Sequence, residues 1–198
     1  MEDFVQDMGP ITCSRIGVVA KAKADKVKLR LVHDLRRSGV NAKMRTHERV
    51  VLPRLSDACE DVLTLIDTVG AESWECVGLD FADAFKQLKV APEERRHLGG
   101  KALDGYICYR TVLFGVRSGP LVWGRIAALL MRLTTAMHVH EKVRMQCFVD
   151  DPFIVIGGSK RERDVILLRI VLLWIALGTS YRGERATAAD LLSGLEHS

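Results

Sequence analysis

The sequence predicts an α+β fold, with an antiparallel sheet packed against helices. Two observations indicate the strands: apolar and polar residues alternate over 75–81, and two apolar, β-prone runs flank a polar turn within 145–158. A third observation indicates the helices, because apolar residues recur at helical spacing over 53–69 and 120–138. With 198 residues, of which 48% are hydrophobic, the chain can bury a core of its own.

The first strands are predicted in the N-terminal third of the chain. Residues 11–23 and 27–35 are expected to form two strands joined by a short turn. Apolar and basic residues alternate in the second strand, so Lys28 and Arg30 should lie on the same face. A further strand is expected over 106–114, between the alternating strand and the second long helix.

Helices are predicted on either side of these strands. The helix over 53–69 and the helix over 120–138, the latter capped by Ser118, are both expected to cover the sheet face opposite the acids discussed next. A third helix is expected over about 160–177. The end of the chain, 186–198, has the pattern of a short amphipathic helix.

Three acids occur where the pattern predicts buried strands. Asp150 and Asp151 stand with Pro152 between two apolar runs, which indicates a tight turn at the tip of a hairpin. Asp80 stands near the end of the largely apolar strand over 75–81. Charge in such a place is usually compensated by a partner or a metal. An ordinary polar turn on a surface hairpin is the alternative interpretation of the acid pair.

Basic residues are concentrated in the N-terminal third. Residues 21–54 contain eleven Lys and Arg against three Asp and Glu, a net charge of +8; the whole chain carries +4, so the remainder carries −4. A basic segment beside acidic clusters favours a polyanionic partner near a metal site. A solvated basic face without a ligand is the alternative.

The cysteines and the apolar runs indicate in which cellular compartment the protein is expected. The five cysteines are scattered and form no C-x-x-C pair, which is typical of reduced thiols in an intracellular protein, nuclear or cytoplasmic. The N-terminus lacks the pattern of a secretory signal. The longest apolar run, 165–177, is interrupted by Arg169 and is too short to span a bilayer. We therefore expect no membrane partner.

Four short motifs follow one another in a fixed order. They are Val32-His33-Asp34-Leu35-Arg36 with Asn41, Leu79-Asp80-Phe81-Ala82-Asp83-Ala84-Phe85, Phe114-Gly115-Val116-Arg117-Ser118-Gly119-Pro120 with Trp123, and Phe148-Val149-Asp150-Asp151. In this order they resemble the fingers segment, the first two palm motifs and the aromatic-x-Asp-Asp hallmark of a reverse transcriptase, most like those of retrotransposons. The resemblance covers roughly residues 15–178 and implies a polymerase palm with a partial fingers lobe.

The resemblance implies an RNA-directed DNA polymerase, a nucleotidyltransferase that works with two divalent ions. Nucleotide addition is an in-line displacement at phosphorus, in which two ions about 4 Å apart stabilise the attacking and leaving oxygens. The family would place these ions, Mg²⁺ or in its stead Mn²⁺, on Asp80 and Asp150, with Asp151 assisting and the Phe81 carbonyl as a further ligand. Mg²⁺ prefers such oxygen ligands.

The resemblance also implies contacts to a deoxynucleoside triphosphate and to a template-primer of RNA or DNA. Arg30 and Lys23 stand at positions where the family binds the triphosphate, and an Arg can bind phosphate bidentately. Phe85 resembles the aromatic steric gate that would clash with a 2′-OH. The nucleotide contacts implied by the palm motifs are Asp83, Ala84, Phe85, Phe114 and Gly115.

The C-terminal end departs from the family pattern. No Lys follows Lys160, although the family usually carries one after its final palm helix, in a motif that begins near Leu-Gly. Here Leu177-Gly178 is followed by Arg182 and Arg185 instead, and Arg is a poor proton donor because its pKa exceeds about 12.

Three segments are therefore expected. Residues 1–54 would form a basic, partial fingers lobe, and 55–178 a palm that carries the catalytic carboxylates. Residues 179–198 form a divergent tail in which no thumb is recognised, so a partner chain could supply the thumb's function.

Two alternatives to an active polymerase stay open. The first is a truncated or degenerate relative that keeps the fold and binds nucleic acid without efficient polymerisation, which the missing Lys and thumb favour. The second is a basic nucleic-acid interaction module in which the acidic hairpin is fortuitous. This second alternative predicts that Asp80 does not converge with the hairpin.

Overall fold

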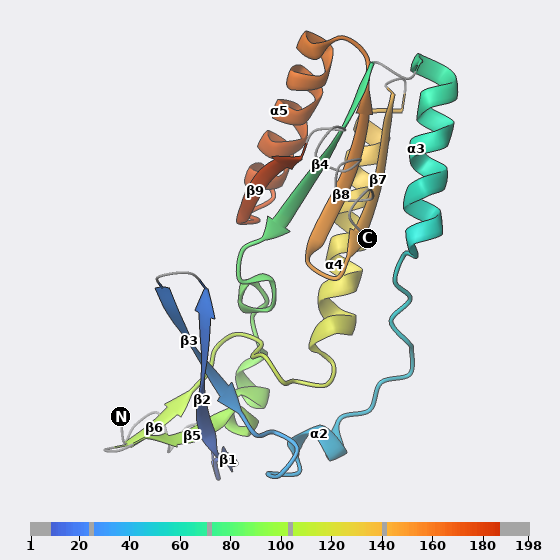
Figure 1. Cartoon of the computed structure of the whole chain (residues 1–198). Coiled ribbons are helices and arrows are strands. Elements are labelled where there is room, and N and C mark those ends of the chain that lie inside the picture. Colours follow the sequence, from blue (N-terminus) through green and yellow to red (C-terminus); the bar gives the residue numbers. More distant parts are fainter. Residues whose placement is uncertain (1–8, 24–25, 71–72, 103–104, 140–141, 187–198) are drawn as a thin grey trace. The chain divides into compact units, whose positions relative to one another are not determined.

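The computed structural model describes residues 9–23, 26–70, 73–102, 105–139 and 142–186 (Figure 1). The chain divides into two compact units, each described by itself below. The first comprises Met1–Arg49 and Phe85–Val122, and the second comprises Val50–Ala84 and Trp123–Ser198.

Three long helices confirm the helical predictions. The helices of the described part are α2 (Val40–Lys43), α3 (Leu55–Val69), α4 (Gly119–Met137) and α5 (Lys160–Ala176), with the 3₁₀ helices η1 (Ala84–Gln87) and η2 (Pro92–His97). At the start of α4 the carbonyl of Ser118 accepts a hydrogen bond from the amide of Val122 at 3.0 Å. The helix expected over 186–198 lies outside the described residues except for Ala186, which ends a strand.

The second unit is built on a four-stranded antiparallel sheet, in the order β7-β8-β4-β9 (Figure 1). Its strands are β4 (Trp74–Phe81), β7 (Val143–Phe148), β8 (Asp151–Gly157) and β9 (Tyr181–Ala186). The predicted strand over 75–81 and the predicted hairpin thus lie in one sheet, with Val77 opposite Ile154. Together with its helices, this sheet gives the chain the α+β fold that the sequence predicts.

Helices cover both faces of this sheet. On one face, Leu65 of α3 packs against Cys76 and Val155. On the other, Trp123 of α4 and Trp174 of α5 pack against Phe81, with ring centroids 5.2 and 5.0 Å apart. Figure 1 shows α3 and α5 on opposite sides of the sheet.

This arrangement corrects the expectation that the helices over 53–69 and 120–138 share one face. In β4, Val77, Leu79 and Phe81 are buried as the alternation predicts, but Cys76, on the face of Asp80, is only 2% exposed. The acid-bearing face therefore has an apolar half, which α3 covers, and an exposed half that contains Asp80.

The first unit contains a hairpin and a small sheet. Strands β2 (Ile16–Lys23) and β3 (Lys26–His33) pair antiparallel, and β1 (Cys13–Ser14), β5 (Gly99–Ala102) and β6 (Gly105–Cys108) form a sheet in the order β1-β5-β6. Its core is formed by buried residues from several loops and short elements: Leu35, Val40, Leu98, Leu113 and Val116.

The strand expected over 106–114 is shorter than predicted, because β6 ends at Cys108. The chain then makes an isolated bridge from Thr111 to Lys89 and enters a turn in which Gly115 has a φ of 100°. That left-handed conformation favours glycine and is incompatible with a continuing strand.

The register of the β2–β3 hairpin assigns its residues to two faces. Val18 pairs with Leu31 and Ala20 with Leu29, which assigns these apolar positions to one face of the ladder. The other face takes the pairs Gly17–Val32, Val19–Arg30, Lys21–Lys28 and Lys23–Lys26. The prediction that Lys28 and Arg30 share a face is therefore confirmed.

Among the described residues, no helix is both long enough and apolar enough to cross a membrane.

Candidate functional site

The acidic hairpin turns over two residues. Phe148 at the end of β7 pairs with Asp151 at the start of β8, so that Val149 and Asp150 alone form the turn. The turn thus begins one residue before the predicted Asp-Asp-Pro, and Pro152 belongs to β8, where it is fully buried. Proline accepts this extended conformation near the start of a strand.

The first turn residue has an uncommon backbone conformation. Val149 has a φ of 60°, in the left-handed region that a β-branched residue seldom adopts. A positive φ at the first of two loop residues is a feature of the tight turns that connect hairpin strands. Such strain persists only where surrounding contacts hold it, and it is concentrated at functional sites.

Contacts from two other elements hold this turn. The indole Nε1 of Trp123 in α4 donates to the carbonyl of Val149 at 2.8 Å. The amide of Phe81 in β4 donates to the carbonyl of Asp150, also at 2.8 Å. The ring of Phe81 lies against those of Trp123 and Trp174, and all three side chains are almost completely buried. The Val149 carbonyl is thus held by the indole of Trp123, and the Asp150 carbonyl by the backbone of β4.

The same hydrogen bond brings Asp80 to the hairpin, because Asp80 directly precedes Phe81. The charges of neighbouring acids raise the pKa values of the two hairpin carboxyls. Burial raises the pKa of Asp150, and the charge of Asp80 raises it further, while a backbone hydrogen bond opposes the rise. Burial likewise raises the pKa of Asp151, with added contributions from the charges of Asp150 and Asp80.

These electrostatics bear on whether the acids could hold a cation. Within the ranges that the structure describes, no group of three or more His, Cys, Asp or Glu side chains is gathered closely enough to hold a metal ion. Three like charges without a cation repel one another, whereas a cation between them favours their ionised forms and their approach. Carboxylate oxygens are the ligand type that Mg²⁺ prefers. The donor set at Asp80, Asp150 and Asp151 therefore suits a divalent cation chemically.

Two more residues expected at the nucleotide follow Asp80 along the chain. Asp83 is exposed and has a φ of 51°, so the chain turns sharply there. Ala84 is buried and begins η1, which agrees with the turn or short helix expected at this point.

The first unit contains the rest of the predicted nucleotide set. Arg30 is exposed on β3, and Lys23 ends β2 on the same face of the ladder. The rings of Phe85 and Phe114 meet edge to face, with centroids 5.2 Å apart. A Cβ at Gly115 would lie 3.3 Å from the carbonyl of His33, which leaves little room for a side chain.

Asn41 holds the turn that carries Phe114 and Gly115. Its Nδ2 donates to the carbonyl of Gly115 at 2.8 Å, and its Oδ1 accepts from the amide of Arg117 at 3.0 Å. One side chain thus satisfies both ends of the turn. The structure therefore places Asp80 and Phe81 beside the Asp150-Asp151 hairpin through a backbone hydrogen bond in the second unit, and it places Phe85 against Phe114 in the first, with Gly115 next in the chain.

Sequence reasoning missed several of these supports. The resemblance quotes Asn41 and Trp123 but does not predict their hydrogen bonds. No pattern indicates the positive φ of Val149, since a β-branched residue there reads as strand. The strand β9 was also missed, because its residues, Tyr181–Ala186, show little apolar alternation; its register places Arg182 opposite Asp80.

Comparisons with known proteins support the fold. No protein-family model and no curated protein matches the sequence. The structure is similar to the crystal structure of the prototype foamy virus protease-reverse transcriptase, with a TM-score of 0.56 and 19% sequence identity over 90% of this chain. The chain spans only 21% of the length of that protein. At this identity the likeness shows a reverse-transcriptase-like fold and no more.

Proposed function

We propose that the chain is the fingers and palm portion of an RNA-directed DNA polymerase, which adds deoxynucleotides to a primer 3′-OH on a nucleic-acid template. The observation that carries the proposal is the convergence of Asp80 with the Asp150-Asp151 hairpin, through the hydrogen bond from the Phe81 amide to the Asp150 carbonyl. This convergence favours a polymerase, active or degenerate, over a basic module with a fortuitous hairpin.

Each residue of the proposal has a chemical role. Asp80 and Asp150 hold two Mg²⁺ or Mn²⁺ ions, with Asp151 and the Phe81 carbonyl assisting. When bound, such ions neutralise charge on the attacking and leaving oxygens. Lys23 and Arg30 bind the triphosphate.

The remaining residues of the proposal shape the nucleotide's surroundings. Phe85 excludes a 2′-OH, its edge-to-face contact with Phe114 fixes the ring, and Gly115 allows close approach of the backbone. Asp83 and Ala84, like Phe85, contact the nucleotide. Phe85→Ala should then raise the use of ribonucleotides relative to deoxynucleotides.

Turnover by this chain alone is expected to be slow. A primer end misplaced by about 1 Å can cost about 10²-fold in rate, and holding the primer end in place is the role of a thumb. Absence of the family's Lys as general acid would remove about 10²-fold more.

Primer extension tests the proposal. The purified chain is incubated with template-primer, deoxynucleotides and Mg²⁺ or Mn²⁺, beside Asp150→Asn and a matched control, Asp67→Asn, which makes the same change on the exposed side of α3. Slow, metal-dependent extension should be abolished in Asp150→Asn and kept in Asp67→Asn. Extension that survives in Asp150→Asn would refute the site.

The degenerate relative is the second candidate. It is favoured by the finding that no group of three metal-ligating side chains is gathered among the described residues. In that case the chain would bind template-primer, with affinity that falls steeply as salt rises, and would extend no primer with either metal.

A further inference from the structure

In the first unit, one loop lies against the ring of Phe85 at two places. This loop comprises residues 114–119 and leads into α4. At one end, the ring of Phe114 meets that of Phe85 edge to face, with 5.2 Å between the centroids and 80° between the planes. At the other end, a Cβ at Gly119 would lie 3.8 Å from Phe85 Cδ1, so the backbone there passes close to the ring. The loop therefore limits where the half-buried ring of Phe85 can lie.

The side chain of Asn41 holds the middle of this loop. Its Nδ2 donates to the carbonyl of Gly115, and its Oδ1 accepts from the amide of Arg117, at 2.8 and 3.0 Å. A primary amide can donate and accept at the same time, whereas a carboxylate only accepts and a methyl group does neither. Asn41 is itself fixed, because its backbone amide donates to the carbonyl of Leu35 at 3.1 Å. Asparagine is thus matched to both backbone groups of the loop.

Other contacts keep the loop attached to the segment around Asn41. Val116 of the loop and Val40, which directly precedes Asn41, are buried in one core with Leu35. Burial of such apolar side chains contributes more to stability than hydrogen bonds at an exposed position do. The first unit should therefore fold without the side chain of Asn41, while the backbone of the loop becomes freer to move.

We propose that Asn41 is a positioning residue that sets how strongly the chain prefers a deoxynucleotide over a ribonucleotide. This inference rests on the proposed function, in which the ring of Phe85 excludes a 2′-OH. A steric barrier of this kind is effective only if the ring cannot move away from the hydroxyl. Asn41 prevents that movement by holding the loop against the ring, so it acts through Phe85 and Phe114 rather than on the nucleotide.

The test compares the binding of dATP and ATP to the full chain. Each nucleotide is titrated with Mg²⁺ present, and the dissociation constants are measured by NMR from the ring protons of Phe85 and Phe114, so that binding elsewhere is not counted. Binding requires no turnover, so slow primer extension does not affect the measurement. In Asn41→Ala the preference for dATP should fall about tenfold, the effect expected when hydrogen bonds that hold the ring are lost.

A second substitution separates the two hydrogen bonds. Asn41→Asp keeps the acceptor for the amide of Arg117 but loses the donor to Gly115, and it brings a carboxylate oxygen towards that carbonyl. Hydrogen exchange of the Arg117 amide should therefore become faster in Asn41→Ala and stay slow in Asn41→Asp. The preference for dATP should fall in both variants, because each leaves the loop without its contact at Gly115.

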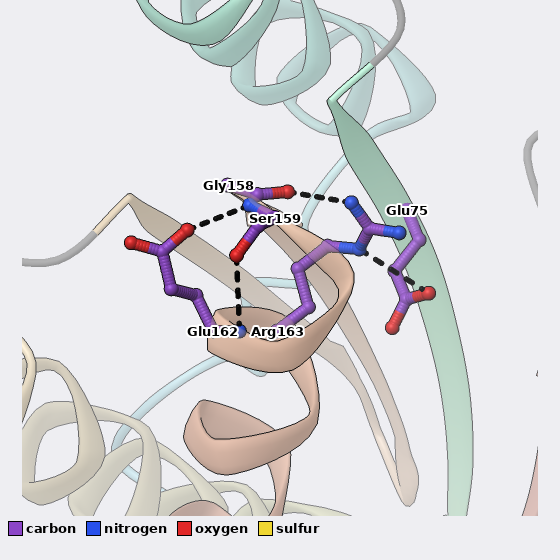
Figure 2. A network of polar contacts seen from close by, with 5 residues as sticks. All are labelled: Glu75, Gly158, Ser159, Glu162 and Arg163. Carbon is purple, nitrogen blue, oxygen red and sulfur yellow. Dashed lines mark hydrogen bonds and ion pairs between the residues drawn. The ribbon is translucent and has the colours of Figure 1, made fainter.

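Ser159→Ala is a control for a general loss of stability. At the start of α5 in the second unit, Ser159 Oγ accepts from the amide of Glu162 at 3.4 Å, and Glu162 Oε2 accepts from the amide of Ser159 at 2.7 Å (Figure 2). The substitution also removes a hydrogen bond between a side chain and the backbone, and loss of such a cap lowers stability. None of the residues drawn in Figure 2 belongs to the set expected at the nucleotide, so the preference for dATP should not change.

The outcomes separate this inference from the proposed polymerase. A preference that falls in the Asn41 variants but not in Ser159→Ala supports the positioning role. An unchanged preference in Asn41→Ala, an equal fall in Ser159→Ala, or a wild-type chain that binds neither nucleotide or binds both equally overturns it. A wild-type chain that prefers dATP but extends no primer would refute the polymerase and leave the role of Asn41 intact.

Discussion

Replacing Trp123 by Phe should loosen the acidic turn as well as lower stability. The side chain is 1% exposed, its indole donates to Val149 at 2.8 Å, and its ring meets Phe81 edge to face. Phe keeps an aromatic ring at this place but removes the donor. The carbonyl of Val149, in a residue with a φ of 60°, then loses this partner.

The cost follows from these contacts. Without the indole, the part-buried Val149 carbonyl keeps only the weak Cys147 Sγ donor at 3.5 Å, and loss of the indole donor costs about 1–3 kcal/mol. The smaller ring leaves a void of about 40 Å³, which at about 24 cal/mol per Å³ adds about 1 kcal/mol. We therefore expect the free energy of unfolding of Trp123→Phe to fall by about 2–4 kcal/mol.

Trp174→Phe is a matched control. Trp174 is also fully buried and also contacts Phe81, but its indole donates to Thr134 Oγ1 at 2.9 Å and not to the turn. Urea unfolding should give a similar or somewhat smaller loss of stability for this variant, since the Thr134 hydroxyl keeps its bond to the carbonyl of Leu130.

The two variants should differ at the acids. NMR titration of the Asp150 and Asp151 carboxyls should give altered pKa values in Trp123→Phe, because the turn that places them relaxes, and unchanged values in Trp174→Phe. Equal effects of the two substitutions on these carboxyls, or none in Trp123→Phe, would refute the role given to the indole hydrogen bond.

Three more predictions concern the same hairpin. Val149→Gly should change the free energy of unfolding, measured in urea, by less than about 1 kcal/mol, because the relief of backbone strain offsets the greater entropy of the unfolded chain. A larger loss would mean that contacts of the valine side chain stabilise the folded state. The raised pKa values of the hairpin acids mean that their carboxyls keep protons in the folded state that they release in the unfolded chain. The free energy of unfolding of the metal-free chain should therefore fall as pH rises from below the ordinary Asp pKa through these raised values. Asp80→Asn should make that fall smaller in urea unfolding at a series of pH values, and an unchanged fall would contradict the charge coupling. The thiol of Cys147, whose pKa is raised to about 12 by burial and by the neighbouring acids, should react with a thiol reagent far more slowly than exposed Cys59, as peptide mapping would show.

Local pattern was sufficient to predict β4, β7 and β8 of the sheet in the second unit, but not β9. The alternation around Asp80 predicted β4, and the helical spacing predicted α3, α4 and α5 close to their observed ends. The motif order also led to the juxtaposition of Asp80 with the hairpin. Each of these features depends mainly on residues near in sequence or on apolar periodicity, which a single sequence displays.

Features that depend on tertiary contacts were not predictable in this way. The face that α3 covers was missed, since Cys76 shares a face with Asp80 and the alternation alone made that face look open. The turn at Val149 was misplaced, because the hydrogen bond from Trp123 that holds its φ comes from a distant helix.

The two hydrogen bonds to the turn have a consequence for how the chain folds. One partner, Phe81, lies far upstream of Asp150, and the other, Trp123, lies on a helix that must first dock on the sheet. Contacts between residues distant in sequence form late, because closing a long loop costs entropy before the contact compensates for it. The hairpin strands can pair early, whereas the acids acquire their final spacing only when β4 and α4 are in place. A partly folded chain would then contain the hairpin without the final arrangement of the acids. A change in the environment of the acids would indicate that the second unit has finished folding.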